Sequence, residues 1–194
     1  MFDTHNAKIN TAGAYIYVNG LYLFAIGIKP HNECIPIVRI GGHQEGCETA
    51  WECAQREALE ETNLNIQPQF PESTYVYDWD HIDNEPQRIQ WQPVICHEPA
   101  PFLVITYRRN KLTTLSIMYC AEAHGIPSPS SEVKGLVLLT EAEVHRQCQE
   151  TVTLKEFLDT GGKAILNGNF DRNRVLEPFA QLRLLSRILM TQPF

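Results

Sequence analysis

The chain has 194 residues, 43% hydrophobic and 20% charged, a balance that is typical of a globular protein with a sizeable core. This composition excludes a disordered or collagen-like chain, and the length predicts a single domain over residues 1–194. The formal net charge of −7 opposes nonspecific binding to nucleic acid phosphates, so we expect no nucleic acid partner.

The cysteine pattern and the apolar stretches bear on location. The six cysteines include no CxxC pair, which predicts reduced thiols rather than a zinc site or a disulfide framework. Residues 1–10 lack the basic start and apolar run of a secretory signal, and the longest apolar stretch, 14–28, is interrupted by Asn19-Gly20. We therefore expect a cytoplasmic protein without a membrane partner.

The first half of the chain predicts strands around one helix. Residues 14–18 and 21–26 flank Asn19-Gly20, the dipeptide typical of a type I′ hairpin turn. A short strand is expected over 35–40 and is predicted to end at Gly41-Gly42. Residues 49–62 are rich in Ala, Glu and Gln and predict a helix.

The proline-rich and aromatic stretch at about 72–101 is too long for an ordinary connection. It predicts an insertion around one short strand near Tyr75. The later elements are expected to be a hairpin of 102–107 and 112–120, a strand at 136–139, helices at 140–149 and 153–158, and a closing amphipathic helix at 177–190. This order predicts an α/β layered domain with a mixed sheet.

Acidic residues are concentrated on the helix at 49–62 and on the loop before it. Six acids and one base lie between Glu45 and Glu61. Glu57, Glu60 and Glu61 are spaced i, i+3 and i+4 and therefore share one helical face, where like charges repel. A divalent cation converts this repulsion into chelation, and oxygen-only ligands select Mg²⁺ or Mn²⁺. The alternative interpretation is a charged helix that is merely solvated.

The Gly41-Gly42 pair precedes this helix and has no side chains to keep a substrate away. A glycine-lined loop followed by an acidic helix face predicts a cradle that holds a metal ion. Such a site polarises phosphoryl oxygens and activates water, as the hydrolysis of a phosphoanhydride requires.

The spacing over Gly42–Leu64 resembles the Nudix box of the Nudix hydrolases. Gly42 is followed by Glu48, by Arg56-Glu57 and by Glu60-Glu61 at the spacing of that motif. Three positions depart from it: Asn63 replaces the closing glycine, Ala58 stands at the aliphatic position, and Cys47 follows Gly46 where the family has glycine next to the first glutamate. Asparagine tolerates the left-handed conformation that such a position often needs.

The resemblance implies a Nudix-like α/β/α sandwich and a divalent-metal-dependent hydrolase that cleaves a diphosphate bond in a nucleoside diphosphate derivative. It implies that Glu57, Glu60 and Glu61 bind Mg²⁺ or Mn²⁺ together with the carbonyl of Gly41, and that Glu57 also acts as the base. By the same resemblance Arg56 orients a carboxylate, while Gly42 and Glu48 shape the loop. Glu132, before the strand at 136–139, is the candidate for a base outside the box.

The expected partner is a small nucleotide-type substrate, and a homodimer is left open. Arg39 precedes the glycine pair and is a candidate ligand of substrate phosphate, while Trp79 and Trp91 are candidates for stacking on a base. We expect the 72–101 insertion to set substrate choice. The alternative function is a non-catalytic Nudix-like module that binds a nucleotide to sense or regulate.

Overall fold

The computed structural model describes residues 7–27, 33–81, 84–91, 98–109, 112–130 and 133–191. Their strands belong to one twelve-stranded mixed sheet on which helices pack, so the predicted α/β class is confirmed. The strands are β1 (Ala7–Val18), β2 (Leu21–Ile26), β3 (Cys34–Val38), β4 (Ile40–His43), β5 (Ile66–Gln69), β6 (Thr74–Asp78), β7 (Gln87–Ile89), β8 (Leu103–Arg109), β9 (Leu112–Ala123), β10 (Gly135–Leu139), β11 (Lys163–Leu166) and β12 (Val175–Pro178). The helices are α1 (Ala50–Thr62), α2 (Glu141–Gln149), α3 (Leu154–Asp159) and α4 (Ala180–Thr191). The expectation of a single domain over residues 1–194 stays a prediction.

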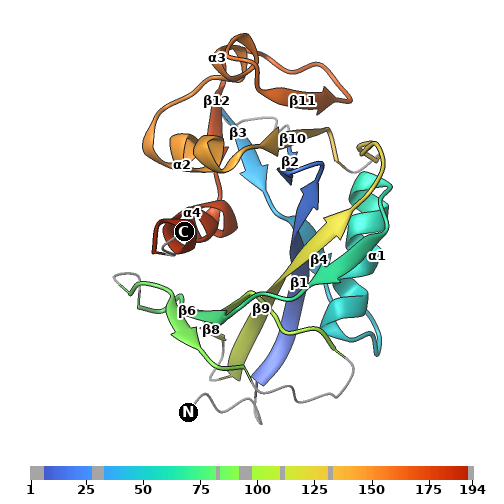
Figure 1. The fold of residues 1–194 in the computed structure, drawn as a ribbon, viewed down its shortest axis with the longest axis vertical. Helices are drawn as coiled ribbons and strands as arrows, with labels where there is room; N and C mark the ends of the chain where they lie inside the picture. Colours follow the sequence, from blue (N-terminus) through green and yellow to red (C-terminus); the bar gives the residue numbers. More distant parts are fainter. Residues whose placement is uncertain are drawn as a thin grey trace.

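The sheet separates two hydrophobic cores. Its main path runs β11-β10-β2-β1-β9-β8-β6-β7, and β1 and β9 pair in parallel at its centre. Figure 1 shows α1 on one side of this sheet and α2 and α4 on the other. The core under α1 contains Ala54 and Ile16, whereas the core under α2 and α4 contains Tyr15 and Leu185. Alternate residues of β1 thus enter opposite cores, because side chains alternate across a strand.

The predicted hairpins are confirmed. Asn19 and Gly20 both have positive φ, 51° and 79°, and join β1 to β2 with Val18 opposite Leu21. β8 and β9 form the second hairpin, although β8 continues to Arg109 rather than turning at Arg108.

The sequence predicted that a strand ends at Gly41-Gly42, and this prediction is wrong. The predicted strand is divided at Arg39 into β3 and β4, and the glycine pair lies within β4. β4 pairs antiparallel with β1, so that Gly42 lies opposite Ala12 and Gly41 opposite Gly13. The pairing partner, and not the local sequence, determines the conformation here.

Two further expectations need correction. The 72–101 insertion contains two strands, β6 and β7, which pair antiparallel at one end of the sheet instead of the one strand predicted. The closing helix begins at Ala180 and not at Glu177, because residues 175–178 pair as β12 in parallel with β3. Short strands that contain proline, such as β5 and β12, carry a weak sequence signal and depend on a neighbouring strand.

Two simpler observations concern helices and thiols. Within the described ranges no helix is both long enough and apolar enough to cross a membrane. The described cysteines, at positions 34, 47, 53, 120 and 148, are all free.

Candidate functional site

Helix α1, which carries the acidic face, has well-defined ends. The Thr49 side chain accepts a hydrogen bond from the backbone of Glu52, and the Glu52 carboxylate accepts one from the backbone of Thr49, a capping box. Asn63 ends the helix at φ 57° and ψ 28°, the left-handed conformation expected where the motif has glycine. These local interactions set the helix register and therefore the face on which the carboxylates lie.

Arg56 is the centre of a charged hydrogen-bond network. Its Nε and Nη2 donate to the two oxygens of Glu48 at 3.1 and 2.9 Å, and Nη2 also donates to the His43 carbonyl at 2.9 Å. Nη1 donates to Glu57 and to Glu60, both at 2.9 Å. One guanidinium thereby joins the loop before α1 to the acidic face of the helix.

The carboxylates of Glu57 and Glu61 lie directly against the glycine pair. The Gly41 N–H donates to Oε2 of Glu61 at 2.8 Å. A Cβ atom added to Gly42 would lie 2.1 Å from Oε1 of Glu57, so this carboxylate occupies the space that a side chain would take. The predicted proximity of the glycines to the acidic face is therefore present in the structure, and it depends on the absence of both side chains.

Gly13 is a third glycine in this arrangement, and the sequence analysis missed it. A Cβ atom on Gly13 would lie 2.2 Å from the Ile40 carbonyl, and one on Gly41 would lie 2.5 Å from Cα of Gly13. Gly41 also has φ of +140°, a conformation that favours glycine. The close approach of β1 to β4 thus requires glycine on both strands, but the register that pairs them is not visible in the local sequence.

Arg39 lies beside the carboxylates, at the break between β3 and β4. Its Nη1 is buried and has no hydrogen-bond partner among the described residues. Burial lowers the pKa of this guanidinium, while the nearby carboxylates of Glu61 and Glu57 raise it. A buried donor that lacks an acceptor costs free energy, so Arg39 is suited to receive an anionic group of a ligand.

The loop before α1 has a strongly perturbed carboxyl group. Hydrogen bonds from Arg56 are the main cause that lowers the pKa of Glu48, to about 2. Burial is the main cause that raises the pKa of the neighbouring Cys53 thiol, to about 11. Glu48 is therefore ionised and Cys53 is neutral at physiological pH, which favours a structural role for Glu48 in the loop and for Cys53 in α1.

Whether the carboxylates fit a metal ion depends on their chemistry and on their present partners. In the part of the chain that the structure describes, no three His, Cys, Asp or Glu side chains converge as metal ligands. Arg56 supplies the counter-charge to Glu57 and Glu60, and Glu61 is bound to the Gly41 N–H. The donor set of three carboxylates on one face suits a hard divalent cation, but chelation requires Glu57 and Glu60 to exchange their contacts with Arg56.

The remaining candidates lie apart. Trp91 is partly buried against the core under α1, whereas Trp79 follows β6 and lines a cavity on the α4 side of the sheet. The structure does not bring the two tryptophans together. Glu132 lies outside the described residues.

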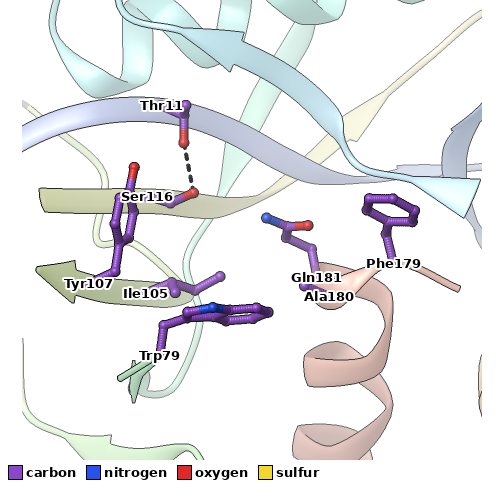
Figure 2. A pocket seen from close by; sticks show the side chains of 8 residues that line it. All are labelled: Thr11, Trp79, Ile105, Tyr107, Ser116, Phe179, Ala180 and Gln181. Carbon is purple, nitrogen blue, oxygen red and sulfur yellow. Dashed lines mark hydrogen bonds between the residues drawn. The ribbon is translucent and has the colours of Figure 1, made fainter. Parts of the chain in front are cut away.

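The cavity beside Trp79 includes residues that the sequence analysis did not select. Phe179 and Gln181 at the start of α4, together with Tyr107 of β8, line it (Figure 2). Nothing in the local sequence marks them, because three segments far apart in the chain meet only in the folded protein.

Comparison with known proteins gives a limited result. No family model matches the chain, and neither does any curated protein. Similar solved structures include a NUDIX-family hydrolase from Clostridium perfringens, with TM-score 0.44 and 19% identity over 72% of this chain and 84% of that one. Others are the ORF135 protein of E. coli, with TM-score 0.47 and 15% identity over 73% and 81%, and a C. elegans Ap4A hydrolase complex, with TM-score 0.44 and 16% identity over 70% and 82%. At such TM-scores and identities the likeness carries over no substrate, metal or mechanism.

Proposed function

We propose that this chain is a Nudix-type, divalent-metal-dependent hydrolase that cleaves a diphosphate bond in a nucleoside diphosphate derivative by attack of water. The observation that carries the proposal is the contact of the acidic face of α1 with a glycine pair. The Gly41 N–H lies 2.8 Å from Glu61, and the Glu57 carboxylate fills the space beside Gly42. The absence of both side chains lets the carboxylates of Glu57 and Glu61 lie against the backbone of β4.

The residues fit Mg²⁺ or Mn²⁺ by the oxygen chemistry of Glu57, Glu60 and Glu61, with the carbonyl of Gly41 as a further ligand. Bound there, the ion would polarise phosphoryl oxygens and activate water. Glu57 would accept a proton from the water that attacks phosphorus. The new bond joins the water oxygen to phosphorus, the anhydride P–O bond breaks, and a monophosphate leaves. Glu132 is the alternative candidate for this base, outside the Gly42–Leu64 motif.

Two arginines contribute charge to this mechanism. Arg56 holds Glu57 and Glu60 on a common side of α1 through contacts of 2.9 Å. Arg39 contributes a buried donor without a partner in the described residues, and we assign to it the role of binding a substrate phosphate. Positive charge placed before the reaction stabilises negative charge that develops in the transition state.

A second candidate function is a nucleotide-binding module without catalysis. The observation in its favour is that, within the described ranges, no three acidic, His or Cys side chains converge as metal ligands. In this alternative Arg56 keeps Glu57 and Glu60 as a structural ion-pair network, and the cavity and Arg39 bind a nucleotide that is not cleaved.

The experiment that separates these functions is a panel of nucleoside diphosphate derivatives incubated with protein and Mg²⁺ or Mn²⁺, with products resolved by ion-exchange chromatography. We expect release of a monophosphate, its loss in excess EDTA, and a loss of at least about 100-fold in Glu61→Gln. Glu150→Gln, which removes one exposed carboxylate at the end of α2, is the matched control and should retain activity. Binding without turnover under every metal condition would favour the non-catalytic module. Full turnover in excess EDTA would refute the dependence of hydrolysis on a divalent metal.

A further inference from the structure

A cavity of about 320 Å³ lies on the side of the sheet opposite α1. It is open to solvent and is lined by β1, by the hairpin of β8 and β9, by the turn after β6 and by the first turn of α4. Figure 2 shows Trp79 and Gln181 facing the same space, with Tyr107 at one end of it and Phe179 at the other. Its volume is at the lower end of the range for small-molecule sites.

Two aromatic side chains form part of its wall and remain unusually exposed. Trp79 is 45% exposed and Phe179 is 37% exposed. The Trp79 backbone N–H donates to the Thr106 carbonyl at 2.8 Å, and its ring packs edge-on against Tyr77 with centroids 5.9 Å apart. The indole is therefore held in place while part of its surface stays in water, an arrangement that favours a stacking platform over core packing.

The Trp79 turn is also held by its neighbours. Asp78 accepts hydrogen bonds from the Asp80 backbone at 3.1 Å and pairs with Nδ1 of His81 at 2.8 Å. Asp80 in turn accepts from the backbone N–H of Arg108 at 2.9 Å. These bonds tie the turn to β8, so the aromatic wall is already in position before a ligand arrives and the entropic cost of binding falls.

The polar groups of the cavity indicate the kind of ligand. The Gln181 side chain offers an amide donor and an acceptor and makes no hydrogen bond within the described part of the chain, while its backbone carbonyl accepts from Tyr15 at 2.8 Å. The Thr11 hydroxyl donates to Ser116 at 2.8 Å, and the Tyr107 hydroxyl accepts from Asn10 at 3.0 Å. None of the described residues that line the cavity carries a formal charge. Aromatic faces with an uncharged amide suit a neutral, planar heteroaromatic ring.

The cavity and the acidic face of α1 lie on opposite sides of the sheet and share strand β1. Thr11, on its wall, pairs with His43, the residue that follows the glycine pair in β4. Tyr15 donates to Gln181 and is also close enough to Arg39 for a mutual electrostatic effect on their pKa values. β1 therefore contributes both to the wall of the cavity and to the strand pair that contains the glycines of β4.

We infer that this cavity binds the base of a nucleotide, with Trp79 and Phe179 as its aromatic walls and Gln181 as the residue that distinguishes bases by their hydrogen-bonding edge. The specificity element is then the start of α4 together with the Trp79 turn, and not the 72–101 insertion alone. The choice of a nucleotide as the source of the planar ring rests on the proposed function, but base binding is measured without turnover.

The test is isothermal titration calorimetry of the full chain, in EDTA, with adenosine, guanosine, cytidine and uridine 5′-monophosphates. We expect one base to bind at least about 10-fold more tightly than another. Trp79→Leu and Phe179→Leu should each weaken the preferred nucleotide about 5- to 150-fold, the loss of one stacking contact. Gln181→Ala should reduce the difference between bases to less than about 3-fold. Phe70→Leu, which changes an aromatic side chain that is 79% exposed elsewhere, is the matched control and should bind as the wild type does.

The outcomes separate this inference from the proposed function. Absence of nucleotide binding, or unchanged binding in both Trp79→Leu and Phe179→Leu, would overturn the cavity assignment even if hydrolysis is observed. Base-dependent binding without turnover under any metal would leave the assignment standing and refute the hydrolase. If Trp79→Leu fails to fold, Phe179→Leu and Gln181→Ala decide, because both side chains lie at the start of a surface helix.

Discussion

Replacing Arg56 by Gln should destabilise the protein in a way that depends on pH, because this one guanidinium compensates three carboxylates. Its contacts with Glu48, Glu57 and Glu60 are all 2.9 Å at their shortest, and the Arg56 side chain is 24% exposed. In the variant the carboxylates remain close to one another and lose their counter-charge. The loss should be larger than that of an isolated surface ion pair.

The magnitude follows from Glu48. Arg56 is the main cause that lowers the pKa of this carboxyl from 4.5 to about 2, a difference that corresponds to at most about 3 kcal/mol of the free energy of unfolding. The ion pair of Glu48 and Arg56 is partly exposed, and solvent screens much of its attraction. We therefore expect Arg56→Gln to lower the free energy of unfolding by about 1–2 kcal/mol at pH 7.

The pKa of Glu48 is lower in the folded state than in the unfolded state, and this fixes the sign of the pH dependence. The stabilisation by Glu48 is fully present above about pH 4.5 and is lost as pH falls toward 2. The difference between wild type and Arg56→Gln should therefore be largest at pH 7 and smaller at pH 3.

Urea denaturation followed by circular dichroism at pH 7 and at pH 3 measures this difference. The matched control is Arg146→Gln, which breaks a pair of 3.0 Å with Glu150 that is more exposed and also spaced i, i+4. We expect a loss of less than about 1 kcal/mol there. A difference in the free energy of unfolding between wild type and Arg56→Gln that is equal at pH 7 and at pH 3 would refute the reasoning.

Two other substitutions test the glycine pair and the end of α1. Gly42→Ala places a methyl group 2.1 Å from the Glu57 carboxylate, which must rotate away. We therefore expect the rate of hydrolysis to fall at least 10-fold, while the free energy of unfolding falls by less than about 1 kcal/mol. A large loss of stability that accompanies the loss of activity would contradict this. Asn63 has φ of 57°, so Asn63→Ala should cost about 1 kcal/mol whereas Asn63→Gly should be neutral. Calorimetric melting of the two variants checks this, and equal stabilities would argue against strain at this position.

The sequence indicates both the α/β class and the residues of the acidic face, since both depend on spacing within single elements. The cavity beside Trp79 could not be predicted in the same way, because Phe179 and Gln181 follow β12, which is absent from the predicted elements.

The sequence alone determined those features in which a residue acts on its near neighbours. Asn19-Gly20 takes the positive φ angles of its turn, Thr49 caps α1, and the spacing of Glu57 and Glu61 on a helix puts their carboxylates on one face. These interactions are made within one segment. Backbone conformational preference and hydrogen bonding over a few residues are therefore sufficient to specify them.

Only the tertiary structure decided which segments meet. The register of β1 with β4 brings Gly13 against Gly41, and the opposite faces of the sheet separate Trp79 from Trp91. Residues 175–178 form a strand because β3 offers a pairing edge, and this places Phe179 at the start of α4. Such choices depend on contacts between residues distant in the chain, whose free energy is gained only when both partners are already folded.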